Sequence, residues 1–251
     1  MRKKRLMTRR QAIFAGLTSA GAFLLYGWLK KAPPTYGNIL RMGDDLTYMA
    51  QRSLLSQRAL APEYQKSEIT SFPVTDIGDP ADPVSKDAYS KEYEHLLRKN
   101  FEGYTLAIEG RVAKPRKYSL EELKKLGGRT QITRHTCEEG WSAIAEWTGV
   151  PLSTVLKDAG IFPDARFVCL YGFDKYGESI DMLDAFHPQT ILAHTMNGEN
   201  IPARNGAPLR LRVETQLGYK NVKFLRRIVV TDQFVDAASD ISAGWSWYTG
   251  I

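Results

Sequence analysis

The sequence predicts an α+β domain that is mainly β, in which mixed sheets carry short helices. Short segments with strand character recur along the second half of the chain, separated by turn residues. Few segments have helical spacing, and strands and helices do not alternate regularly, which argues against a doubly wound sheet. With 251 residues, of which 43% are hydrophobic and 25% charged, the chain can bury a sizeable core without disulfides.

The first 31 residues predict an export signal. They hold eight of the 34 Lys and Arg and none of the 28 Asp and Glu, and their cationic start precedes an uncharged run at 11–29. Arg9 and Arg10 ahead of this run resemble a twin-arginine signal, read by machinery that exports folded proteins. The run is also long enough to act as a membrane anchor. We therefore expect a periplasmic domain whose signal is either cleaved or retained in the inner membrane.

The rest of the chain is slightly acidic, because so many of its cations lie in the signal. A basic surface is therefore not a property of the whole domain, and nucleic acid is not an expected partner.

Residues 32–100 predict a leading helix followed by a loop. Segment 43–61 has helical spacing, with Asp44 or Asp45 placed to cap its start. Segment 61–90 is rich in Pro, Asp, Ser and Thr, which predicts an irregular loop that either crosses the surface or wraps a ligand. A short helix is expected around 89–99.

The core is expected at residues 101–251, forming one domain with 61–100. It begins with a strand at 104–112 and a helix at 119–128, which a capping box from Ser119 to Glu122 starts and two glycines end. A strand at 129–136 runs into Cys137, and a second helix is predicted at 151–160. Later strands are predicted at 165–173, 178–182, 190–196, 208–214 and 224–232.

Cys137 is one of two cysteines, and three roles are open for it: a buried filler, a disulfide with Cys169, or a reactive or metal-binding thiolate. Cys169 lies in an apolar strand, where a free buried cysteine is common. Export permits a disulfide, but a domain of this size gains little from one. Arg134 and His135 next to Cys137 favour a thiolate, which is the form that binds soft metals.

Other site signatures are missing from the sequence. The four His form no HExxH pair, and no CxxC, GxGxxG or P-loop pattern occurs. Zinc, dinucleotide and P-loop nucleotide sites are therefore not expected.

Segment 203–227 concentrates positive charge, with seven Lys and Arg against the single acid Glu214. Turns at Asn205–Gly206 and at Gly218 place backbone N–H groups beside these cations, which suits phosphate or pyrophosphate. The alternative is that the charges alternate on solvent-facing strands, an interpretation that suits Arg212, Arg226 and Arg227. A soft-metal thiolate together with a phosphate cradle indicates an organic cofactor that carries both a metal and a phosphate.

Three segments carry a family resemblance: TRHTCEEGWSAIAEWTGVPL, HPQTILAHTMNGENIPARNGAPLRLRV and LGYKNVKFLRRI. They resemble the molybdopterin-binding domain of the sulfite oxidase family, and most closely its bacterial exported branch, which includes periplasmic methionine sulfoxide reductases. The resemblance covers about residues 100 to 235. It implies a sulfite-oxidase-type fold and a cofactor of molybdenum with molybdopterin. It also implies that Cys137 ligates the metal and that the phosphate end is bound by Asn205, Arg210, Asn221, Val222 and Lys223.

Two departures from the family limit this carry-over. The exported reductases have an asparagine-rich, aromatic segment where this chain has SFPVTDIGDP, so that pterin contact is not expected here. The polar residue that they place after the strand of Cys169 falls near Tyr171 or Gly172. The sequence also has no haem-attachment motif, so electrons are expected to pass to or from another protein, in this family a membrane b-type cytochrome.

The implied reaction is oxygen-atom transfer to or from a small-molecule substrate, with Cys137, Arg134 and His135 as the catalytic set. Arg134 and His135 would tune the metal or meet an anionic substrate, whereas Trp141 and Trp147 are expected to pack under the cysteine turn. A sulfite dehydrogenase is an alternative, although sulfite needs several converging arginines and only Arg134 is placed for this. A non-catalytic cofactor-binding or electron-relay subunit is another.

Overall fold

The computed structural model describes residues 39–251, apart from residues 55, 57–58, 74–90, 175 and 238–244. The predicted export signal at 1–31 and residues 74–90 of the predicted loop lie outside this part of the chain. Among the described residues, no helix combines the length and the apolar character needed to cross a membrane.

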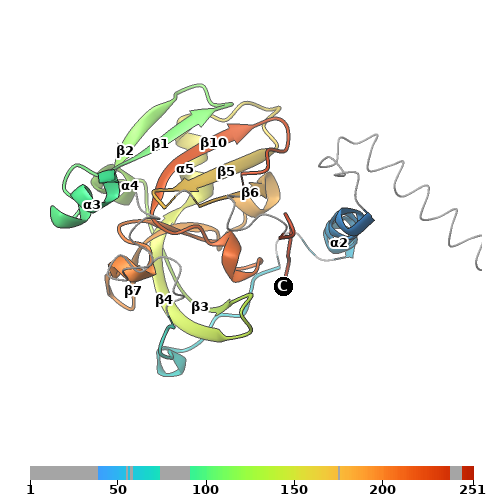
Figure 1. Ribbon diagram of the computed structural model, residues 1–251, viewed down its shortest axis with the longest axis horizontal. Helices are drawn as coiled ribbons and strands as arrows, with labels where there is room; N and C mark the ends of the chain where they lie inside the picture. The colour runs from blue at the N-terminus through green and yellow to red at the C-terminus, as the bar shows by residue number, and fades with distance from the viewer. Residues whose placement is uncertain (1–38, 55, 57–58, 74–90, 175, 238–244) are drawn as a thin grey trace, which may run out of the picture.

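Two sheets organise the molecule, one in the upper and one in the lower half of Figure 1. The first has the strand order β2 (Arg116–Ser119), β1 (Thr105–Gly110), β10 (Leu225–Thr231), β5 (Phe167–Gly172) and β6 (Gly177–Asp181). Only β1 and β10 run parallel in it, so the sheet is mixed. The second is antiparallel and contains β3 (Arg129–Thr136), β4 (Ser142–Pro151), β7 (Ile191–Met196), β8 (Glu199–Asn200) and β9 (Arg210–Arg212).

Short helices and 3₁₀ turns precede β1 or lie in the connections between these strands. They are α3 (Lys91–Arg98), α4 (Leu120–Lys125), α5 (Leu152–Ala159), α6 (Met182–Ala185), η1 (Lys66–Glu68), η3 (Ala203–Asn205) and η4 (Gly218–Lys220). The predicted fold class, α+β with mainly β mixed sheets and short helices, is confirmed.

Local sequence explains α4 and α5. Ser119 accepts a hydrogen bond from the backbone N–H of Glu122, whose carboxylate accepts one from Ser119 N–H, so the predicted capping box starts α4. In α5, four apolar residues at helical spacing are fully buried, and Gly160 ends the helix in the left-handed conformation at φ +70°. This buried face packs into the main core cluster, which also contains residues of β1, β5 and β10.

Strand β4 was not predicted, although its ten residues pair with β3 on one side and β7 on the other. Side chains on both faces of β4 are buried along most of its length, so the alternating pattern of a half-buried strand is absent. Gly149 marks the closest approach to β7, because a Cβ there would overlap the carbonyl oxygen of Leu192. The turn before this strand places Cys137.

The leading helix α2 spans Ile39–Leu54, earlier than the predicted 43–61, so a cap at Asp44 or Asp45 is wrong. Both aspartates lie inside the helix. Arg52 of α2 binds Asp181 and Asp184 at 3.0 and 2.7 Å, at the junction of β6 and α6. The helix is thus docked on the first sheet, close to the C-terminal end of the chain (Figure 1).

The two cysteines do not form a disulfide, because both Cys137 and Cys169 are free and buried. Cys169 lies in β5 and is 1% exposed, so it is a core residue of the first sheet. Of the three roles open for Cys137, the disulfide is therefore excluded.

Candidate functional site

A pocket of about 160 Å³ opens where the β3–β4 turn, the segment after β5, η3 and η4 meet. Seven of the eight predicted site residues line it: His135, Cys137, Asn205, Arg210, Asn221, Val222 and Lys223. They come from segments far apart in the sequence that the second sheet and its turns bring together. Arg134 does not line the pocket.

The Arg134 side chain lies on the face of β3 opposite the pocket. Successive side chains of a strand point to opposite faces, and His135 is buried whereas Arg134 is exposed. The Arg134 guanidinium lies 5.1 Å from the ring centroid of Tyr64. Adjacency in sequence therefore does not bring Arg134 near the thiol of Cys137.

Cys137 is fixed by the tight turn that joins β3 to β4. Its N–H donates to Trp141 O at 2.9 Å and its carbonyl accepts from Gly140 N at 3.1 Å, with Gly140 at φ +90°. Burial, together with the Glu138 carboxylate 3.5 Å from Sγ, raises the pKa of the Cys137 thiol to about 12. The expectation that basic neighbours favour a thiolate is wrong for this site, and a soft metal bound beside Cys137 is the kind of partner that would deprotonate the thiol.

His135 is held from behind by a buried ion pair. Arg212 donates to His135 Nδ1 at 2.8 Å and makes two hydrogen bonds with Glu214, at 3.0 and 2.6 Å. Burial, and then the positive charges of Arg212, Arg210 and Lys223, hold the pKa of His135 well below its usual 6.5, so the ring is neutral. The solvent-facing interpretation is thus wrong for Arg212 and confirmed for the exposed Arg226 and Arg227.

Arg210 and Lys223 form the cationic wall of the pocket. Arg210 donates to the carbonyls of Asn205 and Asn221, at 2.7 and 3.3 Å, and forms no ion pair among the described residues. Its buried Nε has no hydrogen-bond partner in the same part of the chain. Burial lowers the pKa of Arg210 to about 9 and that of Lys223 to about 8. A bound anion would compensate both charges, so this wall suits the phosphate of a cofactor.

The two asparagines differ in what they can offer a ligand. Asn221 accepts from Val213 N at 2.8 Å and donates to Gly218 O at 3.2 Å, so its side chain is used to hold η4. Asn205 is 5% exposed, and its side-chain amide makes no hydrogen bond to any described residue. Only Asn205 therefore has a free side-chain amide facing the pocket, whereas Asn221 contributes through its backbone.

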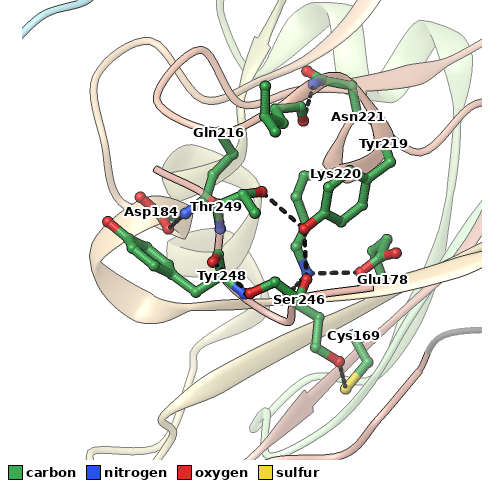
Figure 2. Close-up of polar contacts among 12 residues, drawn as sticks. Cys169, Glu178, Asp184, Gln216, Tyr219, Lys220, Asn221, Ser246, Tyr248 and Thr249 are labelled. Atoms are coloured by element: carbon green, nitrogen blue, oxygen red, sulfur yellow. Dashed lines mark hydrogen bonds and ion pairs between the residues drawn. The ribbon is translucent and has the colours of Figure 1, made fainter. Parts of the chain in front are cut away.

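The C-terminal segment holds η4 in place (Figure 2). Tyr219 donates to Ser246 O at 2.5 Å and accepts from Thr249 Oγ1 at 2.8 Å. Lys220 is buried against Glu178, with Nζ 2.7 Å from Oε2, so this lysine is not part of the pocket wall. The backbone that precedes Val222 and Lys223 is thus fixed before any ligand binds.

Several lining residues were missed by the sequence analysis: Phe72, Asp174, Tyr176, Tyr219 and Trp245. Asp174 follows β5, two residues after the predicted Gly172, and accepts from Tyr176 N at 3.1 Å. Burial raises the pKa of Asp174 to about 6. The Asp-x-Tyr-Gly turn after a strand was a usable signal for it. The same turn contains Tyr176, whereas Phe72, Tyr219 and Trp245 depend on how distant segments pack together.

Phe72 shows that the SFPV segment reaches the pocket although its sequence departs from the family pattern. Its ring lies 5.2 Å from that of His135 and 5.9 Å from that of Trp141, which also lines the pocket. Trp147 is fully buried, between the guanidinium groups of Arg210 and Arg212 at 5.0 and 4.8 Å. Trp147 is thus placed under the site as expected, whereas Trp141 is part of its wall.

Comparison with known proteins identifies relatives along the whole chain. The sequence model described as "Oxidoreductase molybdopterin binding domain" matches residues 94–238. The putative protein-methionine-sulfoxide reductase subunit YedZ1 of Azospira oryzae is 34% identical over 98% of this chain and 88% of its own length.

More distant matches cover less of the other protein. The protein-methionine-sulfoxide reductase catalytic subunit MsrP of Gluconobacter oxydans is 35% identical over 51% of this chain and 47% of its own length. The MsrP of Pseudomonas syringae is 32% identical over 70% and 55%. The chain thus spans about half the length of these catalytic subunits. Among solved structures, the sulfane dehydrogenase SoxCD of Paracoccus pantotrophus matches 52% of this chain and 38% of its own, with 28% identity and a TM-score of 0.49.

Proposed function

The chain belongs to the oxidoreductase molybdopterin binding domain family, and on that premise we propose that it is an exported enzyme that transfers an oxygen atom at a Cys137-ligated molybdenum centre. The family cofactor is molybdenum with molybdopterin. The observation that carries the proposal is a single pocket lined by residues from distant segments of the chain. It contains the Cys137 thiol, the cationic wall formed by Arg210 and Lys223, and the free side-chain amide of Asn205. These groups match a cofactor with a soft metal at one end and a phosphate at the other.

Each end of the cofactor has its own residues in this proposal. Cys137 Sγ would be the protein's ligand to molybdenum. Arg210, Lys223 and the Asn205 amide would bind the phosphate, together with the backbone of Asn221 and Val222. When bound, the cofactor supplies a two-electron centre for oxygen-atom exchange. The protein contributes orientation, charge compensation and exclusion of water.

The charge of the pocket mouth favours a neutral substrate. Glu138 and Glu139 line the pocket next to Cys137, Asp174 lies on its wall, and aromatic rings such as Trp141 and Trp245 supply apolar surface. A sulfoxide fits such a mouth: with two electrons and two protons it gives the sulfide and water. The names of the relatives, which are methionine-sulfoxide reductase subunits, support this substrate class.

Sulfite dehydrogenase is the second candidate, and the pocket supports it less. Sulfite is an anion, and Arg134 faces away from the pocket while Arg212 is committed to Glu214 and His135. The carboxylate of Glu138, 3.5 Å from Cys137 Sγ, would repel an anionic substrate at the metal.

Electrons would come from a separate redox protein, which we propose is a membrane b-type cytochrome facing the periplasm. The support is in the sequence: a twin-arginine-like signal in residues 1–31 and no haem-attachment motif. A non-catalytic relay subunit is the alternative, and it predicts that Cys137 can be replaced without loss of activity.

The test is molybdenum analysis with electron paramagnetic resonance on protein purified from its native host, for the wild type and for Cys137→Ser. We expect stoichiometric molybdenum in the wild type and a loss of metal, or a changed Mo(V) signal, in Cys137→Ser. Cys169→Ala is the control, because Cys169 lies in β5 outside the pocket. A wild type without molybdenum contradicts the proposed function. Sulfoxide-reduction and sulfite-oxidation assays with an artificial electron carrier separate the two substrate candidates.

A further inference from the structure

His135 presents one ring nitrogen to the pocket, and the contacts of the other nitrogen determine which of them carries the proton. A guanidinium group can only donate hydrogen bonds, so His135 Nδ1, 2.8 Å from Arg212 Nη1, must accept. A neutral imidazole has one proton, which must then lie on Nε2. The structure therefore fixes His135 as the Nε2–H tautomer.

Nε2 of His135 lies beside Cys137. His135 is near the end of β3 and Cys137 follows that strand in the turn, and both residues line the same pocket. A Cβ at Gly218 would lie 2.8 Å from His135 Nε2 and 3.1 Å from Cys137 Cα, so a side chain there would crowd both residues. His135 is 6% exposed, and no described residue accepts a hydrogen bond from Nε2.

The pair that holds Nδ1 is buried to an unusual degree for charged residues. The side chains of Arg212 and Glu214 are each 1% exposed. Gln131 donates a further hydrogen bond to Glu214 Oε1 at 3.0 Å, and the Arg212 guanidinium lies 4.8 Å from the ring of Trp147. A buried ion pair seldom adds net stability compared with an apolar pair of similar volume. Its specific consequence here is the orientation of the His135 ring.

We propose that His135 donates a hydrogen bond from Nε2–H to the molybdenum cofactor beside Cys137, and that Arg212 with Glu214 is the pair that positions this donor. The proposal rests on the proposed function, because it needs the cofactor in the pocket. Hydrogen bonds to metal-bound groups orient them and tune the metal, and their removal typically costs roughly 10- to 100-fold in metal affinity or activity.

The tautomer is tested by long-range ¹H–¹⁵N spectra of the oxidised holoprotein labelled with ¹⁵N-histidine, since Mo(VI) is diamagnetic. His135→Gln identifies the signals of His135 among the four histidines. We expect protonation at Nε2 alone in the wild type. In the double variant Arg212→Met/Glu214→Leu, which removes both charges of the ion pair together, we expect a mixture of tautomers. Protonation at Nδ1 in the wild type would overturn the proposal.

The contact with the cofactor is tested by molybdenum retention on dialysis and by the Mo(V) resonance. His135→Met removes the donor, and we expect metal loss at least about tenfold faster, with a shifted signal. His135→Gln, which keeps an N–H donor, should recover part of both. His95→Gln on the exposed face of α3 is the matched control.

The outcomes separate this inference from the function on which it rests. Wild-type retention and signal in His135→Met, or a change in KM alone, would overturn the donor role while leaving the molybdenum enzyme intact. A wild type that contains no molybdenum overturns the proposed function and with it the donor role. Altered retention in His135→Met together with an altered signal in Arg212→Met/Glu214→Leu supports the proposal.

Discussion

Some residues of the pocket carry charges that are buried without a full set of ion-pair and hydrogen-bond partners. Arg210 is the clearest case, because it has two backbone carbonyls as partners and a buried Nε without any. Burying such a cation costs free energy that a bound phosphate can offset. The site is thus built for a ligand that brings negative charge.

Replacing Arg210 should weaken cofactor binding more than it weakens the fold. For Arg210→Met we expect molybdenum retention to fall about 10- to 100-fold, because one charge-assisted contact to phosphate contributes about 1.5 to 3 kcal/mol. Molybdenum content after graded dialysis measures this. Arg227→Met is the control, since Arg227 is exposed and lies 3.8 Å from Glu109. Equal retention in the two variants would contradict the role of Arg210.

Asp174 gives a prediction for pH dependence. Burial raises the pKa of Asp174 to about 6, above the 3.8 of an exposed carboxyl. Between these values the folded protein binds more protons than the unfolded one, so the contribution of Asp174 to stability falls as pH rises from about 4 to 6.

Asp174→Asn keeps an acceptor for Tyr176 N and should remove this loss. We expect the variant to gain about 2 to 3 kcal/mol over the wild type at pH 7.5 and almost nothing at pH 4, measured by urea unfolding. Asp232→Asn, at an exposed position, should show no such difference. Parallel pH curves for Asp174→Asn and wild type would contradict the assignment.

At the residue scale, motifs predicted more of the site than neighbouring residue types did. Cys137, Asn205, Arg210, Val222 and Lys223 all line one pocket, and the role of each was assigned through the family resemblance. Arg134 was assigned to the site because it is close to Cys137 in the sequence. The two-residue period of β3 places its side chain on the face away from the pocket. Phe72 and Trp245 could not be predicted, since their positions depend on packing between distant segments.

Elements show the same division. Helices α4 and α5 follow from capping and apolar spacing, which are local, whereas β4 gave no local signal because both of its faces are buried. The turn η4 was anticipated only as a glycine beside cations. Its placement against β3 depends on contacts between segments some 80 residues apart, such as the approach of Gly218 to Cys137.

Gly218 is the point where η4 packs on the cysteine turn, and adding a methyl group there should displace the turn. A Cβ would lie 2.8 Å from His135 Nε2, tighter than ordinary van der Waals contact, so Gly218→Ala must displace either the His135 ring or η4 from its present position. We expect reduced molybdenum retention with a loss of about 1 to 3 kcal/mol in unfolding free energy.

Gly128→Ala is the control for this element, because nothing lies within 4 Å of a Cβ built at Gly128. It should keep both retention and unfolding free energy near wild type. If Gly218→Ala also keeps wild-type retention, the backbone of η4 does not contact the cofactor.

Across the whole molecule, hydrogen bonds connect the leading helix to the pocket wall. Arg52 of α2 binds Asp184, which accepts from Gln216 at 2.7 Å; Gln216 in turn accepts from Thr249, and Thr249 donates to Tyr219. Figure 2 shows the part of this hydrogen-bonded series that runs from Asp184 to Tyr219. Helix α2 therefore braces the pocket from behind, whereas the C-terminal segment both carries this connection and contributes Trp245 to the pocket wall.

Arg52 tests this brace, because its removal leaves Asp181 and Asp184 buried without their cation. For Arg52→Met we expect the free energy of unfolding to fall by about 2 to 4 kcal/mol at pH 7.5, against less than about 0.5 for Arg98→Met, whose partner Glu94 has a 45% exposed side chain.

The effect of Arg52→Met should also depend on pH. Burial already raises the pKa of Asp181, and Arg52 opposes this, so the pKa of Asp181 rises further in the variant. A carboxyl with a raised native pKa loses stability as pH increases, so the deficit of Arg52→Met should be smallest in acid and largest at neutral pH. Adding Asp181→Asn should recover part of the loss at pH 7.5 and little at pH 4. Urea unfolding at both pH values measures this, and a deficit that does not change with pH would show that Arg52 acts by packing and not by its charge.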